Sequence, residues 1–175
     1  GVEVLLIDTG RAVGGQFHRQ LPVEFKARRP ERLQHGWREF VRQRDRIAGH
    51  SRITHLTETS VWAIERYAQR NEGAAQDGTR KTTRLWLQQG PADAVGRRVW
   101  PVDAAAVVLA TGAYDRVLPI PGWDLPGVYS AGAAQALAKG QRIAIGRRVL
   151  VAGTGPFLLP VAESLIGVGA EVKIG

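Results

Sequence analysis

An acid and several glycines in this sequence have the types and spacing that could hold a nucleotide. Asp8 ends the apolar run of residues 2–8, which has the unbroken hydrophobicity of a buried strand. A carboxylate at the tip of such a strand can accept charge-assisted hydrogen bonds from the hydroxyls of a ribose. The alternative is an ordinary solvated Asp at a strand end, and the residue by itself leaves both open.

A second nucleotide signal is the stretch VLVAGTGPFLLPVAESLIGVGAEV, residues 149–172. It predicts a strand, a turn with Gly153-x-Gly155, a helix and another strand, which together form a βαβ unit. Gly153 would allow the tight turn, and Gly155 would let the backbone approach a pyrophosphate at the helix N-terminus. Leu158 stands at the third glycine position of this fingerprint and weakens the prediction. The alternative is a turn in which glycine only relieves packing.

Two further glycine sites could touch a ligand. Gly14-Gly15-Gln16 holds two residues that adopt positive φ readily, and Ala110-Thr111-Gly112 follows another apolar run. Each could equally be a plain turn.

The elements that must position these residues alternate between strands and helices, which predicts an α/β fold. Residues 60–67, 82–89 and 97–102 read as an antiparallel meander, with a polar turn between the first two strands at 69–81. Further strands are predicted at residues 2–8, 52–56, 104–112 and 148–153, and helices at 30–48 and 129–140. The run 104–112 is expected to be a third buried strand that ends at Thr111.

The composition excludes several kinds of chemistry. The chain has no cysteine, so a redox disulfide, a thiolate nucleophile and a cysteine-ligated metal are absent. The four histidines lack metal-ligand spacing, and no nucleophile elbow is present. A sequence that can hold a cofactor but lacks acid–base machinery is typical of redox enzymes, in which the cofactor performs the reaction.

The formal net charge is +8. The arginines are dispersed, and several fall on the polar face of the helix predicted at 30–48, which favours a solvated surface over a nucleic-acid stripe. Some could attract an anionic cofactor or an acidic partner subunit. The sequence has no signal peptide and no apolar run long enough for a membrane span, so we expect a cytoplasmic protein.

The order of these parts resembles the FAD/NAD(P)-dependent oxidoreductases of the pyridine-nucleotide reductase superfamily. The resemblance is carried by the acid after the first strand, GGQ, the meander, VVLATGAYDR, PIPGWDLPGVYSAGAAQAL and RVLVAGTGPFLLPVA. Residues 107–163 are particularly similar to the flavin subunits of opine oxidases, of hydrogen cyanide synthase and of related amino-acid dehydrogenase complexes.

The resemblance implies an FAD/NAD(P)-binding Rossmann-like fold with three layers and an antiparallel meander. The family's first strand and its G-x-G-x-x-G loop would lie upstream of Gly1, and both ends of the chain fall within strand patterns, so we expect a fold truncated at both ends. Residues 1–115 would form a partial FAD-binding domain, 116–145 a connector, and 146–175 the start of a second NAD(P)-binding-type unit.

The resemblance also implies roles for individual residues, while catalytic residues stay unassigned. Asp8 would hold the adenosine ribose of FAD, and Val61 would meet the adenine through its backbone. Gly14, Gly15 and Gln16 would lie along the flavin, Thr111 and Gly112 would approach the pyrophosphate of FAD, and Gly153, Gly155 and Pro156 would open a second site for NAD(P) or another adenine nucleotide.

The implied function is that of a part of a flavin-dependent oxidoreductase. It would belong to an amine, opine or amino-acid dehydrogenase complex that passes electrons through FAD, with a small-molecule substrate and with a partner subunit. The alternatives are an inactive gene fragment and a non-catalytic nucleotide-binding subunit.

Overall fold

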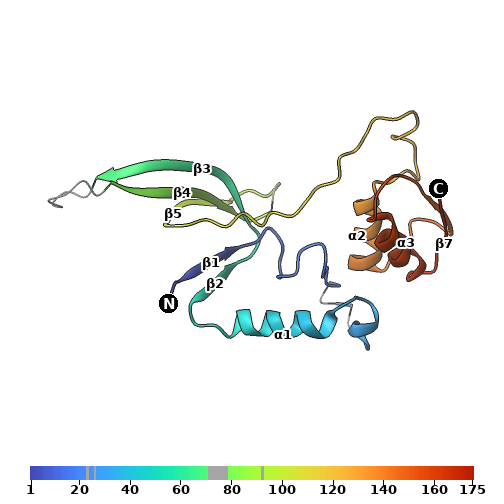
Figure 1. Ribbon diagram of the computed structural model, residues 1–175, viewed down its shortest axis with the longest axis horizontal. Helices are drawn as coiled ribbons and strands as arrows, with labels where there is room; N and C mark the ends of the chain where they lie inside the picture. Colours follow the sequence, from blue (N-terminus) through green and yellow to red (C-terminus); the bar gives the residue numbers. More distant parts are fainter. Residues whose placement is uncertain (23, 26, 71–78, 92) are drawn as a thin grey trace. The chain divides into compact units, whose positions relative to one another are not determined.

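The computed structural model describes the chain from residue 1 to 175 except residues 23, 26, 71–78 and 92 (Figure 1). The chain is α/β, and it divides into two compact units that are each discontinuous in sequence. The first compact unit comprises residues 1–13 and 44–111, and the second comprises 14–43 and 112–175. The polar turn predicted at 69–81 lies largely outside the described residues.

In the first compact unit, β1 (Val4–Ile7) and β2 (Ile53–Leu56) form a parallel pair. The strands are where the sequence predicts them, but the prediction that the first is fully buried is wrong. Val4 is 47% exposed and Leu5 is 37% exposed. Val4 and Leu5 are neighbours in a strand, so their side chains project from opposite faces of the β1–β2 pair, and both faces are left partly open at this point.

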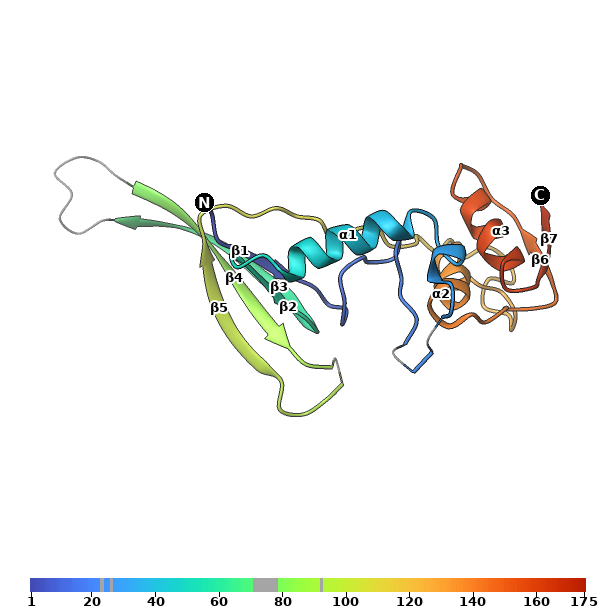
Figure 2. The same cartoon turned by 90° about the horizontal axis from the view of Figure 1, so that it is seen from below.

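The larger sheet of the first compact unit is the antiparallel meander, which confirms the prediction (Figure 2). Its strands are β3 (Thr59–Arg70), β4 (Thr79–Gln89) and β5 (Arg98–Ala104). A β-bulge shifts the register between Val61 and Ala63. Leu85 and Leu87 of the central strand are buried, and they anchor one face of this sheet.

The buried strand predicted at 104–112 is absent. β5 ends at Ala104, and residues 106–112 form neither helix nor strand. Val108 is 90% exposed and Leu109 is 71% exposed. A strand needs a neighbour for its backbone hydrogen bonds, and no strand of the described residues pairs with this run. Its apolar sequence therefore stays extended and uncovered.

The second compact unit contains the predicted βαβ arrangement. β6 (Arg148–Val151) and β7 (Glu171–Ile174) are parallel, and α3 (Leu158–Ile166) connects them. α2 (Ala131–Gln141), at the helix predicted for 129–140, packs against α3. The core of this unit is made of small and branched apolar side chains from α2, β6, α3 and the turn before β7: Ala134, Ala138, Val151, Val161, Leu165 and Ala170.

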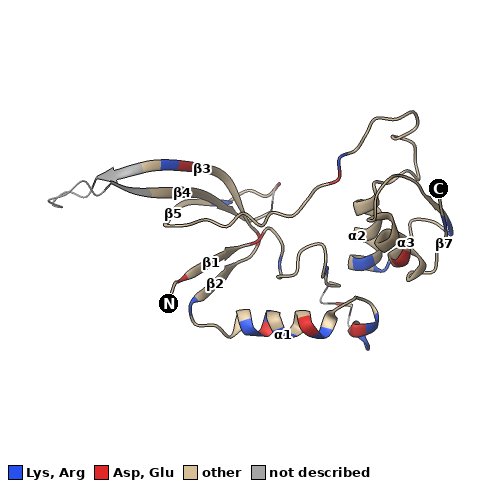
Figure 3. Ribbon diagram, in the orientation of Figure 1, with Lys and Arg blue, Asp and Glu red and all other residues tan. Residues whose placement is uncertain are grey.

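The helix predicted at 30–48 is interrupted. The chain forms a short 3-10 turn, η1 (Pro30–Arg32), and then α1 (Trp37–Ala48). Gly36 lies between them with φ of +66°, a left-handed conformation that cannot continue a right-handed helix. Phe40 is the buried residue of α1, and charged residues cover its other sides (Figure 3).

Within the described ranges, no helix combines the length and the apolar character that a membrane crossing requires.

Candidate functional site

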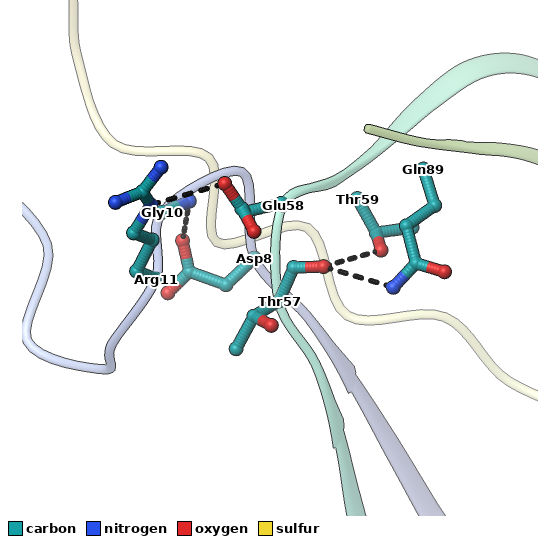
Figure 4. A network of polar contacts seen from close by, with 7 residues as sticks. All are labelled: Asp8, Gly10, Arg11, Thr57, Glu58, Thr59 and Gln89. Carbon is teal, nitrogen blue, oxygen red and sulfur yellow. Dashed lines mark hydrogen bonds and ion pairs between the residues drawn. The ribbon is translucent and has the colours of Figure 1, made fainter. Parts of the chain in front are cut away.

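Asp8 lies at the carboxyl end of β1, where three segments of the first compact unit meet (Figure 4). Its backbone N–H donates to the carbonyl of Leu56 at 2.9 Å, and its carbonyl accepts from the N–H of Thr59 at 3.0 Å. The carboxylate oxygen Oδ1 accepts from the N–H of Gly10 at 2.7 Å. The main chain of Asp8 is thus tied to the end of β2 and to the start of β3.

Glu58 reinforces this junction through its backbone. It adopts a left-handed φ of +50°, which is strained for a residue with a Cβ. Its N–H donates to the carbonyl of Gly10, and its carbonyl accepts from the N–H of Gly90, both at 3.0 Å. Its carboxylate also pairs with Arg11 Nε at 3.0 Å. These bonds join the end of β1, the β2–β3 turn and the end of β4.

Thr57 and Thr59 complete the junction. The carbonyl of Thr57 accepts from Thr59 Oγ1 at 2.8 Å and from Gln89 Nε2 at 3.3 Å, and Thr59 is fully buried. A small polar cavity of about 250 Å³ opens beside it. The cavity is lined by Thr9, Glu58, Ser60, Gln88, Gly90, Pro91 and Arg97.

The arrangement leaves part of Asp8 free for a ligand. The side chain is half-buried, and within the described residues its second oxygen, Oδ2, accepts no hydrogen bond. A carboxylate with one oxygen fixed by the backbone and one oxygen free is oriented to accept from a sugar hydroxyl.

Val61 and Thr111 are the other two residues of the first compact unit that are predicted to contact FAD, and only Val61 lies near a residue that bonds to Asp8. Val61 lies on β3, two residues after the Thr59 that bonds to Asp8, and is 38% exposed. Its partner across the sheet is Leu87, and the bulge begins directly after it. Thr111 is exposed in the extended run after β5, and among the described residues no hydrogen bond joins it to Asp8.

The glycines predicted to touch FAD in the second compact unit have the expected backbone conformation. The φ angles of Gly14, Gly15 and Gly112 are +116°, +55° and +73°. A Cβ built on Gly15 or Gly112 would meet no atom within 4 Å, so the backbone at these two positions is open to a ligand. Gln16 is exposed.

The glycine backbone in the turn after β6 is also accessible to a ligand. Gly153 and Gly155 have φ of +148° and +103°, and a Cβ on Gly155 would meet nothing within 4 Å. Pro156 precedes Phe157, the N-cap residue of α3, and Phe157 makes no side-chain capping bond. Leu158, the departure from the fingerprint, packs on the core and reaches within 3.6 Å of a Cβ built on Gly153. The uncapped helix end and the open glycine suit an anionic group.

The sequence interpretation missed a charged network on the meander. Arg84 Nε and Nη2 donate to the two carboxylate oxygens of Asp103 at 2.7 and 2.8 Å, and the Tyr67 hydroxyl donates to Asp103 Oδ2 at 2.7 Å. The hydrogen bonds from Arg84 and Tyr67 lower the pKa of Asp103 to about 2, and the bond to Asp103 raises the pKa of Tyr67. Because Arg84 faces Asp103 only through strand register, residue types alone could not reveal the pair.

Within the described part of the chain, no group of three or more histidine, aspartate or glutamate residues could hold a metal ion. The Nε2 atoms of His18 and His55 are buried without a hydrogen-bond partner.

Several known proteins similar to this chain are, by name, subunits of oxidases. The chain is 31% identical to the opine oxidase A subunit of Rhizobium meliloti, over 98% of this chain and 30% of that protein. It is 32% identical to the sarcosine oxidase alpha subunit of Corynebacterium sp. strain P-1, over 73% of this chain and 13% of that protein. It is 39% identical to the HcnB subunit of hydrogen cyanide synthase from Pseudomonas aeruginosa, over 43% of this chain and 16% of that protein.

The chain spans about a third of the length of the opine oxidase subunits that it matches. No protein-family model matches the sequence, and no solved structure matches it. The similarity is therefore to a segment of oxidoreductase subunits.

Proposed function

We propose that this chain is a cofactor-holding part of a flavin-dependent oxidoreductase, in which Asp8 holds the adenosine ribose of FAD. The observation that carries the proposal is the free Oδ2 of Asp8 at the carboxyl end of a parallel strand pair. In open α/β sheets, ligands bind outside the carboxyl ends of the strands, and an acid at that position accepts from ribose hydroxyls. FAD would supply the redox chemistry, and this chain would bind and orient it.

The glycines support the same proposal. Gly15, Gly112 and Gly155 each combine a positive φ with open space where a Cβ would be. Backbone N–H groups at such positions can approach phosphates or a flat ring without steric hindrance. Val61, Gln16 and Thr111 keep their proposed places along FAD, because each is exposed to a ligand.

We further propose that the turn of Gly153, Gly155 and Pro156 receives the pyrophosphate of NAD(P) or of another adenine nucleotide. Its support is the parallel β6–β7 pair with α3 between the strands, and a helix N-terminus without a side-chain cap. The partial positive charge of that helix end favours a phosphate.

The similar proteins support a place for this chain in an amine, opine or amino-acid dehydrogenase complex. The opine oxidase and sarcosine oxidase relatives are subunits by name, so we propose that this chain works with a partner subunit.

The test measures the equilibrium binding of FAD to the chain and to the Asp8→Asn variant. Quenching of flavin fluorescence reports the bound fraction. Removing the charge at one hydrogen-bonded carboxylate should weaken binding by roughly tenfold or more. Asp93→Asn, which changes an exposed acid of the same compact unit, is the matched control and should bind as the original chain does. Equal affinity for the original chain and Asp8→Asn would reject the proposed role of Asp8.

A second measurement separates the catalytic proposal from its main alternative. The flavin-loaded chain is mixed anaerobically with amines, opines and amino acids, and the absorbance of oxidised flavin is followed, with and without a partner subunit. A loss of the oxidised-flavin absorbance would support the proposal that the chain is part of an oxidoreductase. Tight binding of FAD with no bleaching under any condition favours a non-catalytic nucleotide-binding subunit.

A further inference from the structure

The turn at Gly14 is packed against α1 so closely that it has no room for a side chain. A Cβ built on Gly14 would lie 2.8 and 2.9 Å from two ring carbons of Phe40, and 3.0 Å from the carbonyl oxygen of His18. Phe40 is only 5% exposed, so its ring has little freedom to move away. The absence of a Cβ at Gly14 therefore lets the turn rest directly on the Phe40 ring.

His18 closes the same turn and stacks on the same ring. Its N–H donates to the carbonyl of Gly14 at 3.0 Å, and its imidazole lies parallel to Phe40, with ring centroids 4.5 Å apart and 15° between planes. Trp37 and Phe17 extend the group, at 5.3 Å from Phe40 and 4.6 Å from His18. We call Phe17, His18, Trp37 and Phe40 the aromatic clamp.

The imidazole of His18 contributes to the aromatic clamp as a ring and not as a hydrogen-bonding group on its inner side. Its Nε2 is buried and has no hydrogen-bond partner. That atom faces the backbone at Gly36, where a Cβ would lie 3.8 Å away. An unpaired buried nitrogen is costly, so stacking is the favourable interaction that keeps His18 in place.

A second helix of the same compact unit holds the other side of the loop. Lys139 of α2 donates from Nζ to the carbonyl of Phe17 at 3.4 Å, and its ammonium lies 5.4 Å from the centre of the Phe17 ring. Burial lowers the pKa of Lys139. A Cβ on Gly140 would lie 2.7 Å from the Arg19 side chain, so the loop also rests closely on α2. Residues 14–19 are thus fixed by contacts from both α1 and α2.

We propose that His18 and Phe40 are positioning residues for a cofactor-binding turn: they stack face to face beneath Gly14 and hold Gly14-Gly15-Gln16 in the conformation that meets the flavin ring. This inference rests on the proposed function, because it takes the flavin as the ligand of the turn. His18 and Phe40 act on the cofactor only through the turn. Gly15 and Gln16, which follow the clamped glycine, are the exposed residues that touch it.

The affinities for FAD and for ADP can distinguish a positioning role from a general loss of structure. Asp8 is proposed to hold the adenosine half of FAD, whereas the aromatic clamp supports the turn that is proposed to meet the flavin. Loss of stacking should therefore weaken FAD binding and leave ADP binding unchanged. A variant that unfolds the protein would weaken both.

The experiment measures FAD and ADP affinity, by calorimetry, for the chain and for His18→Ala, His18→Phe and Phe40→Leu. Losing one aromatic stack should reduce FAD affinity about threefold to tenfold in His18→Ala and Phe40→Leu, with ADP affinity unchanged. His18→Phe keeps the ring and removes the unpaired nitrogen, so it should bind FAD at least as well as the original chain. His35→Ala and Phe25→Leu alter exposed rings of the same compact unit and serve as matched controls.

The outcomes separate this inference from the proposed function. If the original chain binds FAD and His18→Ala and Phe40→Leu bind it equally well, the positioning role is overturned. An equal loss of FAD and ADP affinity in both variants, with a lowered melting temperature, would assign the aromatic clamp to folding alone and would also overturn it. If the original chain binds neither ligand, the proposed function fails, and this inference fails with it.

Discussion

The two parallel strand pairs of the chain have similar apolar sequences and different degrees of burial. β1 has the sequence VLLI, exposes both Val4 and Leu5 and has no buried residue, whereas β6 has the sequence RVLV, exposes Leu150 and buries Val151 on its other face. The segments that connect the two strands of each pair explain the difference in burial. α3 joins β6 directly to β7 and packs on the pair, with Val161 and Leu165 almost completely buried. β1 reaches β2 only after a long stretch in which α1 buries Phe40 alone.

The comparison teaches that an apolar strand sequence predicts a strand but not its burial. Parallel strands become buried when crossover helices cover them and when strands pair on both edges. The β6–β7 pair has its crossover helix in place. Within the described residues both pairs are two-stranded sheets with open edges, so the crossover helix is the feature that distinguishes them. Substitutions in the two units can test this difference, beginning with the largest expected effect.

Leu165→Ala should destabilise the second compact unit by about 2–5 kcal/mol, because it opens a cavity where a side chain is fully buried. Leu5→Ala should cost less, about 1–1.5 kcal/mol, because 37% of that residue already contacts solvent. Urea unfolding followed by circular dichroism measures both. A loss at Leu5 as large as that at Leu165 would show that another segment covers β1, and the comparison would break.

Asp115→Ala should destabilise the second compact unit by about 1 kcal/mol. Asp115 Oδ2 accepts from the N–H of Gly132 at 2.7 Å in the first turn of α2, close to where the Ser130 side chain also accepts from the helix. Thermal melting of Asp115→Ala and of the control Asp124→Ala, which alters an exposed acid of the same unit, would measure the effect. Identical melting temperatures would show that Ser130 alone caps this helix.

The first compact unit should lose stability in acid through Asp103, and this is the smallest expected effect because the network is exposed. The folded pKa of about 2 lies below the ordinary aspartate value, so the contribution is complete above about pH 4 and is lost as pH falls toward 2. Asp103→Asn should remove this pH dependence and lower stability at neutral pH. Urea midpoints between pH 2 and 7 would measure it. A slope that persists unchanged in Asp103→Asn would assign acid sensitivity to other carboxylates.

Several elements follow from local patterns and could be predicted from the sequence. The meander has alternating strands, and the βαβ unit has apolar strands separated by glycines and a helical period, so both were found. The break in the helix predicted at 30–48 was missed because an isolated Gly36 is compatible with a helix until its φ is known. The strand predicted at 104–112 was wrong because pairing depends on distant segments.

Some residues of the candidate site could likewise be predicted from the sequence, and others could not. Asp8 and the glycines could be proposed as site residues from their residue types, and Asp8, Gly153 and Gly155 also from their places after strands. The aromatic clamp could not, because His18 and Phe40 are far apart in the sequence and a histidine in a loop carries no signal of stacking. The Tyr67–Arg84–Asp103 network likewise depends on the register of three strands. Side-chain partnerships across tertiary contacts need the structure.

The interleaving of the two compact units along the sequence affects the order in which the chain can fold during synthesis. Residues 1–13 must wait for 44–111, and residues 14–43 must wait for 112–175. A ribosome adds about 5–20 residues per second, so β1 emerges seconds before its partner β2. During that interval Val4 and Leu5 lack the β2 partner that they have in the folded unit.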